Sequence, residues 1–204
     1  MSLESSKEGR ASSPVAALKA ASHATHQQLE ASLPWARAFA SREGYGRLLR
    51  AFLSLVKGAD AAVDRVLGRN GFCPCGDSRR RAEWIETDLE RLAPAGSGSI
   101  PAPADFSFVD SRGAAIGVLY VLEGSALGAQ VLSRELESRL GITAETGGSY
   151  LHAYGERTAE AWQAFVAWAN QELSSPDLLN SAIRATLLTF DRFAQHLTDA
   201  FDAR

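Results

Sequence analysis

The feature that most constrains this chain is a pair of glycines inside a stretch that otherwise has the pattern of a buried helix. Within residues 112–136, Gly124 and Gly128 stand four positions apart. A glycine inside a helix costs roughly 0.5–1 kcal/mol relative to alanine. Residues four apart share one face of a helix, so these two leave bare backbone on that face. The sequence therefore predicts close approach of either a second helix or a flat ligand.

Composition limits the class of protein. The chain has 204 residues, of which 46% are hydrophobic, enough for one domain or at most two with a sizeable core. The net charge of −3 provides no broad basic field, so we expect no nucleic-acid partner. Residues 1–13 are polar and lack the apolar core of a signal peptide. We therefore expect a flexible N-terminal segment and a cytoplasmic protein.

Apolar residues recur at helical spacing in segments separated by proline, glycine and serine. Ser13-Pro14 and Ser175-Pro176 each combine a capping hydroxyl with a proline at the first helical position. No convincing alternating strand pattern occurs. The sequence predicts a single all-α domain over residues 14–204, with loops at 93–108 and 143–155. The expected helices cover residues 14–33, 41–66, 78–92, 111–140, 158–168 and 176–201.

One weakly charged run, residues 113–132, is long enough to raise the question of a membrane span. It contains Glu123 near its centre, as well as Gln130. We therefore interpret it as a core helix and expect no membrane association. Glu123 needs a partner inside the fold, for which Arg134 and Arg112 are the candidates. A small-residue seam at this helix is also typical of helix–helix packing, and that interpretation stays open.

Two histidines on the first helix are the candidate metal ligands. His26 borders the apolar stripe, whereas His23 falls on the polar side, so His26 is the better choice. Partial burial favours the neutral imidazole that binds metals. Lys19 precedes His26 by two helical turns, about 10 Å along the axis, and could meet an anionic group of the same ligand. The alternatives are a hydrogen-bonded boundary histidine and a solvated lysine.

Other chemistries lack their motifs. No phosphate-binding loop, nucleophile elbow or Glu-x-x-His pair is present. Cys73 and Cys75 lack the further ligands of a zinc site, and we interpret them as two thiols in a loop.

Several segments, in order, resemble bacterial heme oxygenases of the biliverdin-producing kind. The likeness extends from about Ala16 to Leu197, and its most specific part is the motif at residues 119–125. Residues 18–22 and 26–30 resemble the family's proximal helix, residues 119–125 and 127–129 its distal helix, residues 154–165 the start of the following helix, and residues 190–197 its closing helix. The resemblance implies a helical heme-oxygenase-like fold in which heme lies between the proximal and distal helices.

The resemblance also implies roles for named residues. His26 is the expected ligand to the heme iron. Gly124 and Gly128 would let the distal helix lie close over the macrocycle, and Ser125 would hold ordered water near bound oxygen.

Further expected heme contacts are Lys19 and Tyr120 at the propionates and Phe193 along the pocket. The chain departs from the family at Gln163, where a basic residue is common, and this puts propionate anchoring on that side in question.

The function implied by the resemblance is oxidative ring opening of heme to biliverdin, with release of carbon monoxide and ferrous iron. Heme would be both substrate and cofactor, and O2 the co-substrate. No flavin or nicotinamide site is visible, so electrons would come from a ferredoxin or a reductase. The product could supply a biliverdin-binding photoreceptor. Two alternatives remain: a heme carrier or sensor of the same fold without ring opening, and an all-α module whose glycine seam packs a partner helix.

Overall fold

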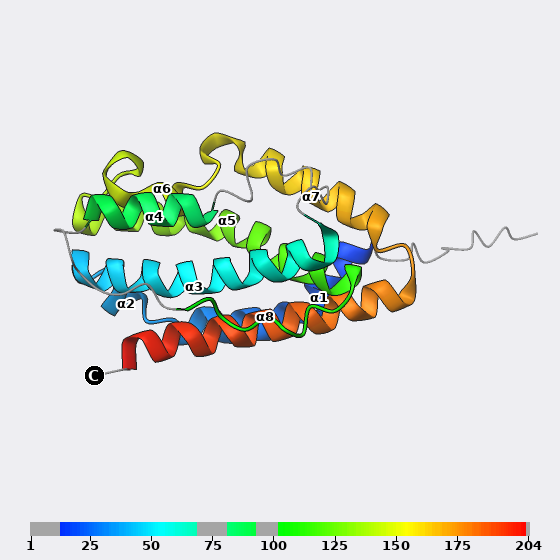
Figure 1. Ribbon diagram of the computed structural model, residues 1–204. Helices are drawn as coiled ribbons and strands as arrows, with labels where there is room; N and C mark the ends of the chain where they lie inside the picture. The colour runs from blue at the N-terminus through cyan, green and yellow to red at the C-terminus, as the bar shows by residue number, and fades with distance from the viewer. Residues whose placement is uncertain (1–12, 69–80, 93–101, 203–204) are drawn as a thin grey trace, which may run out of the picture.

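A computed structural model describes residues 13–68, 81–92 and 102–202, and within these ranges the regular structure is entirely helical (Figure 1). The predicted all-α fold is confirmed. The elements are α1 (Pro14–Ser32), α2 (Trp35–Ala38), α3 (Arg42–Leu67), α4 (Arg81–Leu92), α5 (Arg112–Leu140), the π-helical segment η2 (Ala144–Gly148), α6 (Ser149–His152), the 3₁₀ turn η3 (Gly155–Arg157), α7 (Thr158–Glu172) and α8 (Pro176–Asp202).

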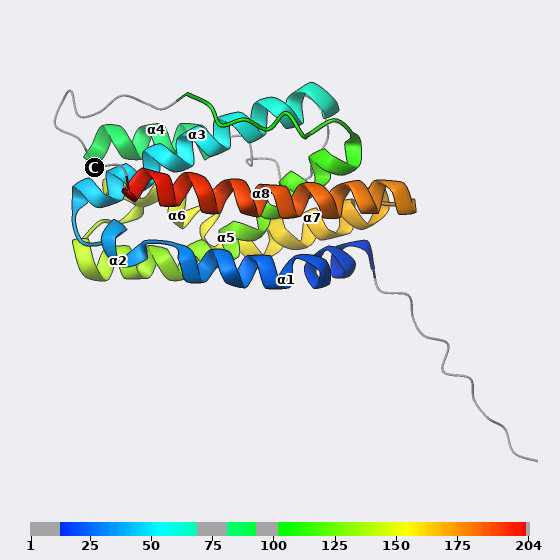
Figure 2. The ribbon, with the colours of Figure 1, turned by 90° about the horizontal axis from the view of Figure 1, so that it is seen from below.

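The long helix α8 organises the bundle. It runs the length of the molecule beside α1 and also packs on α3 and α5, as the two perpendicular ribbon views show (Figures 1 and 2). α4 packs on α3, and α7 packs on α5. The buried hydrophobic side chains of these helices form one core cluster. α1 and α5 both pack on α8, and this shared contact brings together the two helices that carry the site described below.

Local capping signals place most helix ends where the sequence predicts them. The side chains of Ser13, Ser41 and Ser111 accept hydrogen bonds from backbone N–H groups in the first turns of α1, α3 and α5. Gly141 ends α5 in the left-handed conformation, with φ of 65°. The short helix α2 was not predicted. The predicted start of α4 at Ser78 lies outside the described residues, as do Cys73, Cys75 and residues 1–12.

The prediction of a loop over residues 143–155 is wrong, because η2, α6 and η3 lie there. The cause is a distant carboxylate. Asp88 on α4 accepts hydrogen bonds from the backbone N–H groups of Ser149 and Tyr150, at 2.9 and 2.8 Å. These bonds satisfy donors at the start of α6, a role usually taken by a local N-cap residue. The local sequence contains no sign of a partner some sixty residues away.

The glycines at the start of α5 mediate helix packing within the chain. A Cβ at Gly117 would overlap the carbonyl oxygen of Ala182 on α8, and one at Gly113 would overlap that of Leu178. Thr186 also donates a hydrogen bond to the Gly117 carbonyl, at 3.1 Å. The helix-packing interpretation of the small-residue seam is therefore correct for this end of α5.

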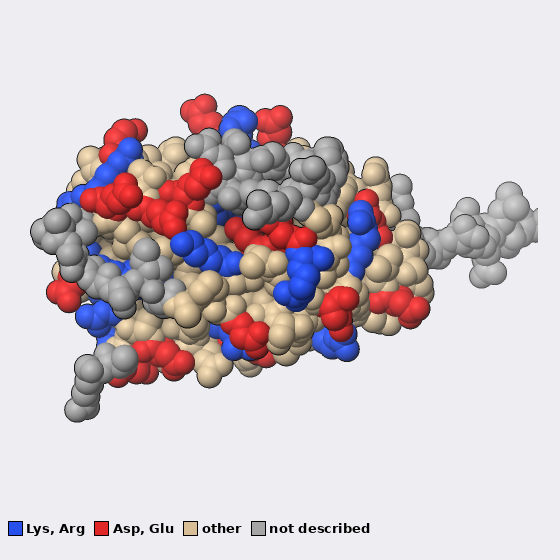
Figure 3. All heavy atoms as spheres, viewed as in Figure 1, with Lys and Arg blue, Asp and Glu red and all other residues tan. Residues whose placement is uncertain are grey.

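By length and composition, α5 is the one described helix that could cross a membrane, and half of its apolar window is buried inside the fold. Its contacts with α3, α7 and α8 agree with the predicted core helix. Acidic and basic side chains are interspersed over the face drawn in Figure 3, which offers no extended basic patch.

Replacing Gly117 with alanine is expected to lower the free energy of unfolding by about 1–3 kcal/mol, because the new methyl group overpacks the α5–α8 contact. Gly128→Ala is the matched control on the same helix, since nothing lies within 4 Å of the Cβ position there. The control should leave stability unchanged or raise it by up to about 1 kcal/mol. Urea denaturation of the two variants tests this, and equal destabilisation would contradict it.

Mild acidification should lower the stability of the fold, because it protonates His196. Its Nε2 lies 3.0 Å from Ser54 Oγ, with Arg192 and Asp199 nearby. Burial, followed by Arg192, lowers the pKa of His196 from 6.5, so the unfolded chain binds this proton more readily than the fold does. The contribution of His196 to the free energy of unfolding is fully present above about pH 6.5 and is lost as pH falls through the lowered pKa. Melting temperatures between pH 7 and 5 should therefore decline less steeply for His196→Gln than for the wild type.

Candidate functional site

A cavity of about 990 Å³ opens between α1 and α5. Its volume lies at the upper end of the range of small-molecule sites. Aromatic and aliphatic side chains from several helices form most of its walls, among them Phe52 of α3, Trp84 of α4, Tyr150 of α6, Trp162 of α7 and Phe190 of α8. This lining favours a large apolar ligand with a few polar attachment points.

The structure brings all of the predicted site residues to this one cavity. They are Lys19, His26, Tyr120, Gly124, Ser125, Gly128 and Phe193. Residues from α1, α5 and α8 are thus gathered around one space, as a ligand held between two helices requires.

The α1 wall carries His26 on a stripe that also includes Lys19, His23 and Glu30. The His26 side chain is 48% exposed, so the expected partial burial of this imidazole is not as strong as predicted. Its Nε2 lies 3.5 Å from Glu30 Oε1, and its ring lies 5.2 Å from the ring of Phe190. The imidazole is therefore positioned from two sides while it faces the cavity.

His23 also lines the cavity, so its assignment to a separate, polar face is wrong. Residues three apart on a helix are neighbours on its surface, which brings His23 to the same wall as His26.

The α5 wall is bare backbone at Gly128, because nothing lies within 4 Å of the position of a Cβ there. At Gly124 a Cβ would stand 3.6 Å from the indole of Trp162, in ordinary van der Waals contact. Ser125 donates its hydroxyl proton to the carbonyl of Leu122, at 2.7 Å. The Ser125 oxygen therefore keeps its lone pairs as acceptors at the cavity wall.

Polar groups collect at the end of the cavity near the start of α1. Lys19 lies there, and the hydroxyl of Tyr120 hydrogen-bonds with Ser22 on the next turn of α1. Burial raises the pKa of Tyr120, against the effect of that hydrogen bond, so the phenol stays neutral at physiological pH. The Tyr120 ring packs 5.7 Å from that of Trp162. An ammonium group and a phenol thus lie together in the lining of a mainly apolar cavity.

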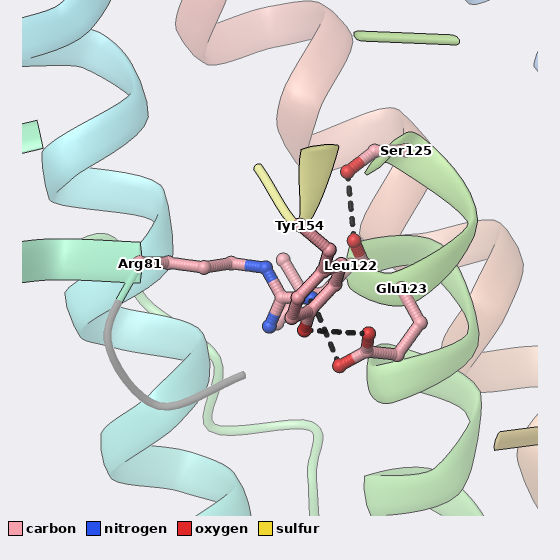
Figure 4. Close-up of polar contacts among 5 residues, drawn as sticks. All are labelled: Arg81, Leu122, Glu123, Ser125 and Tyr154. Carbon is pink, nitrogen blue, oxygen red and sulfur yellow. Dashed lines mark hydrogen bonds and ion pairs between the residues drawn. The ribbon is translucent and has the colours of Figure 1, made fainter. Parts of the chain in front are cut away.

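Beneath the α5 wall lies a buried ion pair that sequence reasoning assigned incorrectly (Figure 4). Glu123 pairs with neither Arg134 nor Arg112, which binds Glu172 instead. Its partner is Arg81 at the start of α4, with a guanidinium nitrogen 2.8 Å from Glu123 Oε1. The error has a simple cause, because helical spacing identifies partners on the same helix and not those on another.

The described residues include no group of three or more His, Cys, Asp or Glu side chains arranged to hold a metal ion. A metal at His26 would therefore have to arrive already bound in another ligand. A flat, largely apolar ligand with acidic substituents fits the size of the cavity, its bare wall, and its basic end.

Known proteins resemble this chain over most of its length. The sequence profile of the family described as Heme oxygenase matches residues 13–199. A curated heme oxygenase from Xanthomonas campestris pv. campestris (strain 8004) is 33% identical over 129 residues, which cover 62% of this chain and 71% of that protein. Crystal structures of NO- and CO-bound heme oxygenase from Neisseria meningitidis share the fold, with a TM-score of 0.70 at 23% identity, over 94% of this chain and 93% of that one.

Proposed function

The chain belongs to the heme oxygenase family, and on that premise we propose that the cavity between α1 and α5 binds heme with His26 as the ligand to its iron. The protein is a heme oxygenase, an enzyme that opens the heme ring to biliverdin. The observation that carries the proposed site is that predicted residues from three separate helices line one cavity.

The residues present fit heme. The cavity has the volume of a large small-molecule site and mainly apolar walls. It offers the imidazoles of His26 and His23, and the described residues include no group of three or more potential metal ligands. Heme, when bound, supplies the iron that activates O2 and is itself the substrate, which yields biliverdin, carbon monoxide and ferrous iron.

His26 would hold the iron, and Glu30 would orient the imidazole. The two side chains lie one helical turn apart on α1 and approach to 3.5 Å. A carboxylate that accepts the second N–H of a metal-binding histidine fixes the ring and raises the basicity of the ligand. A thiolate ligand donates electron density strongly and so favours O–O cleavage at the metal. A neutral nitrogen ligand lacks this donation.

α5 would cover the opposite face of the macrocycle. The absence of side chains at Gly124 and Gly128 would let the α5 backbone lie close to a flat ligand. The Ser125 oxygen, with its proton committed to Leu122, can accept a hydrogen bond from a water molecule at this wall. We infer that this water is the route by which protons reach the reacting face.

Lys19 and Tyr120 would bind the propionates, since they supply a cation and a hydroxyl at one end of the cavity. Phe193, which packs 6.2 Å from Phe52, would support the ring edge. Gln163 is exposed and is absent from the lining, where its neighbour Trp162 takes part instead. The propionate end is therefore anchored mainly from α1 and α5.

The protein would act in the cytoplasm with an external electron donor such as a ferredoxin or a reductase. Its product could be delivered to a biliverdin-binding photoreceptor. Aerobic turnover of hemin with ascorbate or a ferredoxin system tests the function itself. Loss of the Soret band with growth of biliverdin absorbance is the expected result, and a stable Soret band would indicate a carrier instead.

Replacing His26 with alanine is expected to abolish ring opening and to change the visible spectrum of bound heme. Mutation of a residue that merely hydrogen-bonds to a metal ligand lowers metal affinity or activity about 10–100-fold. Loss of the ligand itself should therefore have a larger effect. His23→Ala is the matched variant from the same wall and should keep the spectrum of an imidazole-ligated heme. Absorption spectra of both hemin complexes test the assignment, and equal spectral changes would refute it.

A bulky side chain at Gly128 should block heme while leaving the protein folded. Gly128→Leu places an isobutyl group into open cavity, where nothing lies within 4 Å of the Cβ position. We expect heme affinity to fall at least about tenfold, because the ring could no longer approach the helix backbone. Hemin titration monitored at the Soret band gives the affinity, and circular dichroism of the apo-protein checks the fold. Unchanged affinity would show that α5 does not face the macrocycle.

A further inference from the structure

The Arg81–Glu123 ion pair is the most deeply buried charge pair in the described part of the chain. The two side chains are only 5% and 1% exposed. Tyr154 donates a hydrogen bond to Glu123 Oε2, at 3.0 Å, and its hydroxyl also lies 3.4 Å from an Arg81 nitrogen (Figure 4). Trp84 packs edge-on against the Tyr154 ring, at 5.8 Å. The pair thus sits in a closed setting built from three segments of the chain.

Its location links this pair to the cavity. Arg81 itself contributes to the cavity lining, and Glu123 directly precedes the wall residues Gly124 and Ser125. The contact fastens α5 to α4 and to the residue before η3 at the point where the α5 backbone is bare. A shift of α5 relative to α4 would therefore pull the two charges apart.

Stability alone gives no reason for a buried ion pair here, because apolar residues of similar volume are often equally stabilising at such sites. Burial opposes the charge on Arg81, but the carboxylate of Glu123 outweighs this effect and raises the pKa of Arg81, which stays a cation. Arg81 and Glu123 carry opposite charges at close range, so each offsets the field of the other. Removing one partner would change the charge beside the cavity by one unit, and low polarity there makes the resulting change in field strong.

We propose that the Arg81–Glu123 ion pair sets the electrostatic field at the heme, because the carboxylate of Glu123 offsets the cation of Arg81 at this wall of the cavity. The inference rests on the proposed function only in placing heme in the cavity. Tyr154 supports the pair by holding the carboxylate from a third segment. Neither charged residue is proposed to touch the reacting atoms.

The test uses Arg81→Met, Glu123→Gln, the double variant of both, and Glu86→Gln. Glu86 is the matched control, because it lies on α4 in a partly exposed ion pair with Lys57. The midpoint potential of bound heme, measured by spectroelectrochemistry, should fall in Arg81→Met, which removes a positive charge, and rise in Glu123→Gln, which removes a negative charge. The double variant and the control should keep the wild-type potential. Melting of the apo-proteins should show a marked loss for each single variant and near-complete recovery in the double variant.

Shifts of the same sign in the two single variants, or no shift, would overturn the proposal, since a merely structural role moves both in one direction. If neither single variant folds, the double variant decides: it must melt near the wild type and bind heme at an unchanged potential. Misfolding of the double variant, or a shifted potential in it, would also overturn the proposal. If the wild type fails to bind hemin, the proposed function fails instead, and the apo-protein melting data still report on the ion pair.

Discussion

The backbone of α5 has to meet two different neighbours, and the rest of the structure depends on this requirement. At its start, Gly113 and Gly117 let it approach the backbone of α8. Two turns further on, Gly124 meets only the edge of an indole, and Gly128 meets nothing. One helix therefore belongs to the core along its first half and forms the wall of a cavity along its second. Substituting alanine throughout would favour the helix but would disturb the packing and narrow the cavity.

This division of α5 determines what the other helices must supply. α8 packs on both α1 and α5, so it joins the two helices that form the walls of the cavity. The cavity-facing stripe of α1 then offers two imidazoles and an ammonium group, while Phe190 and Phe193 of α8 contribute apolar lining. The site thus combines a histidine ligand, a few charged and polar groups and mainly apolar sides. A heme-binding enzyme needs this combination, because the reactive metal comes with the ligand.

The sequence predicted those parts of the fold that local interactions determine. Ser13, Ser41 and Ser111 cap helices through side chains that bond to their own first turns, so their signals could be recognised without knowledge of the fold. The gathering of His26 and Gly128 around one cavity came from the family resemblance, since spacing alone does not place two helices opposite each other. The helix-face argument for His23 failed because a helical wheel has no sharp border between a polar and a cavity-facing side.

The remaining errors share one physical origin on α4. Arg81 and Asp88 lie seven positions apart, two turns on the same face and about 10 Å along the axis. Both are buried, and each binds a segment far away in sequence: Arg81 holds Glu123 of α5, and Asp88 holds the start of α6 at Ser149. Burial raises the pKa of Asp88, and the hydrogen bonds that the carboxylate accepts from Tyr150 and Ser149 oppose this shift.

α4 therefore acts as a polar clamp on the side of the cavity formed by α5 and α6. Its contacts are charged and directional, and a bond of this kind holds a helix at one position along its axis, whereas apolar packing tolerates sliding. Hydrophobic periodicity, the main signal in a sequence, carries no information about such pairs. Charged residues on the buried side of a short helix, such as Arg81 and Asp88, are the signal that could have indicated them, because buried charges need partners.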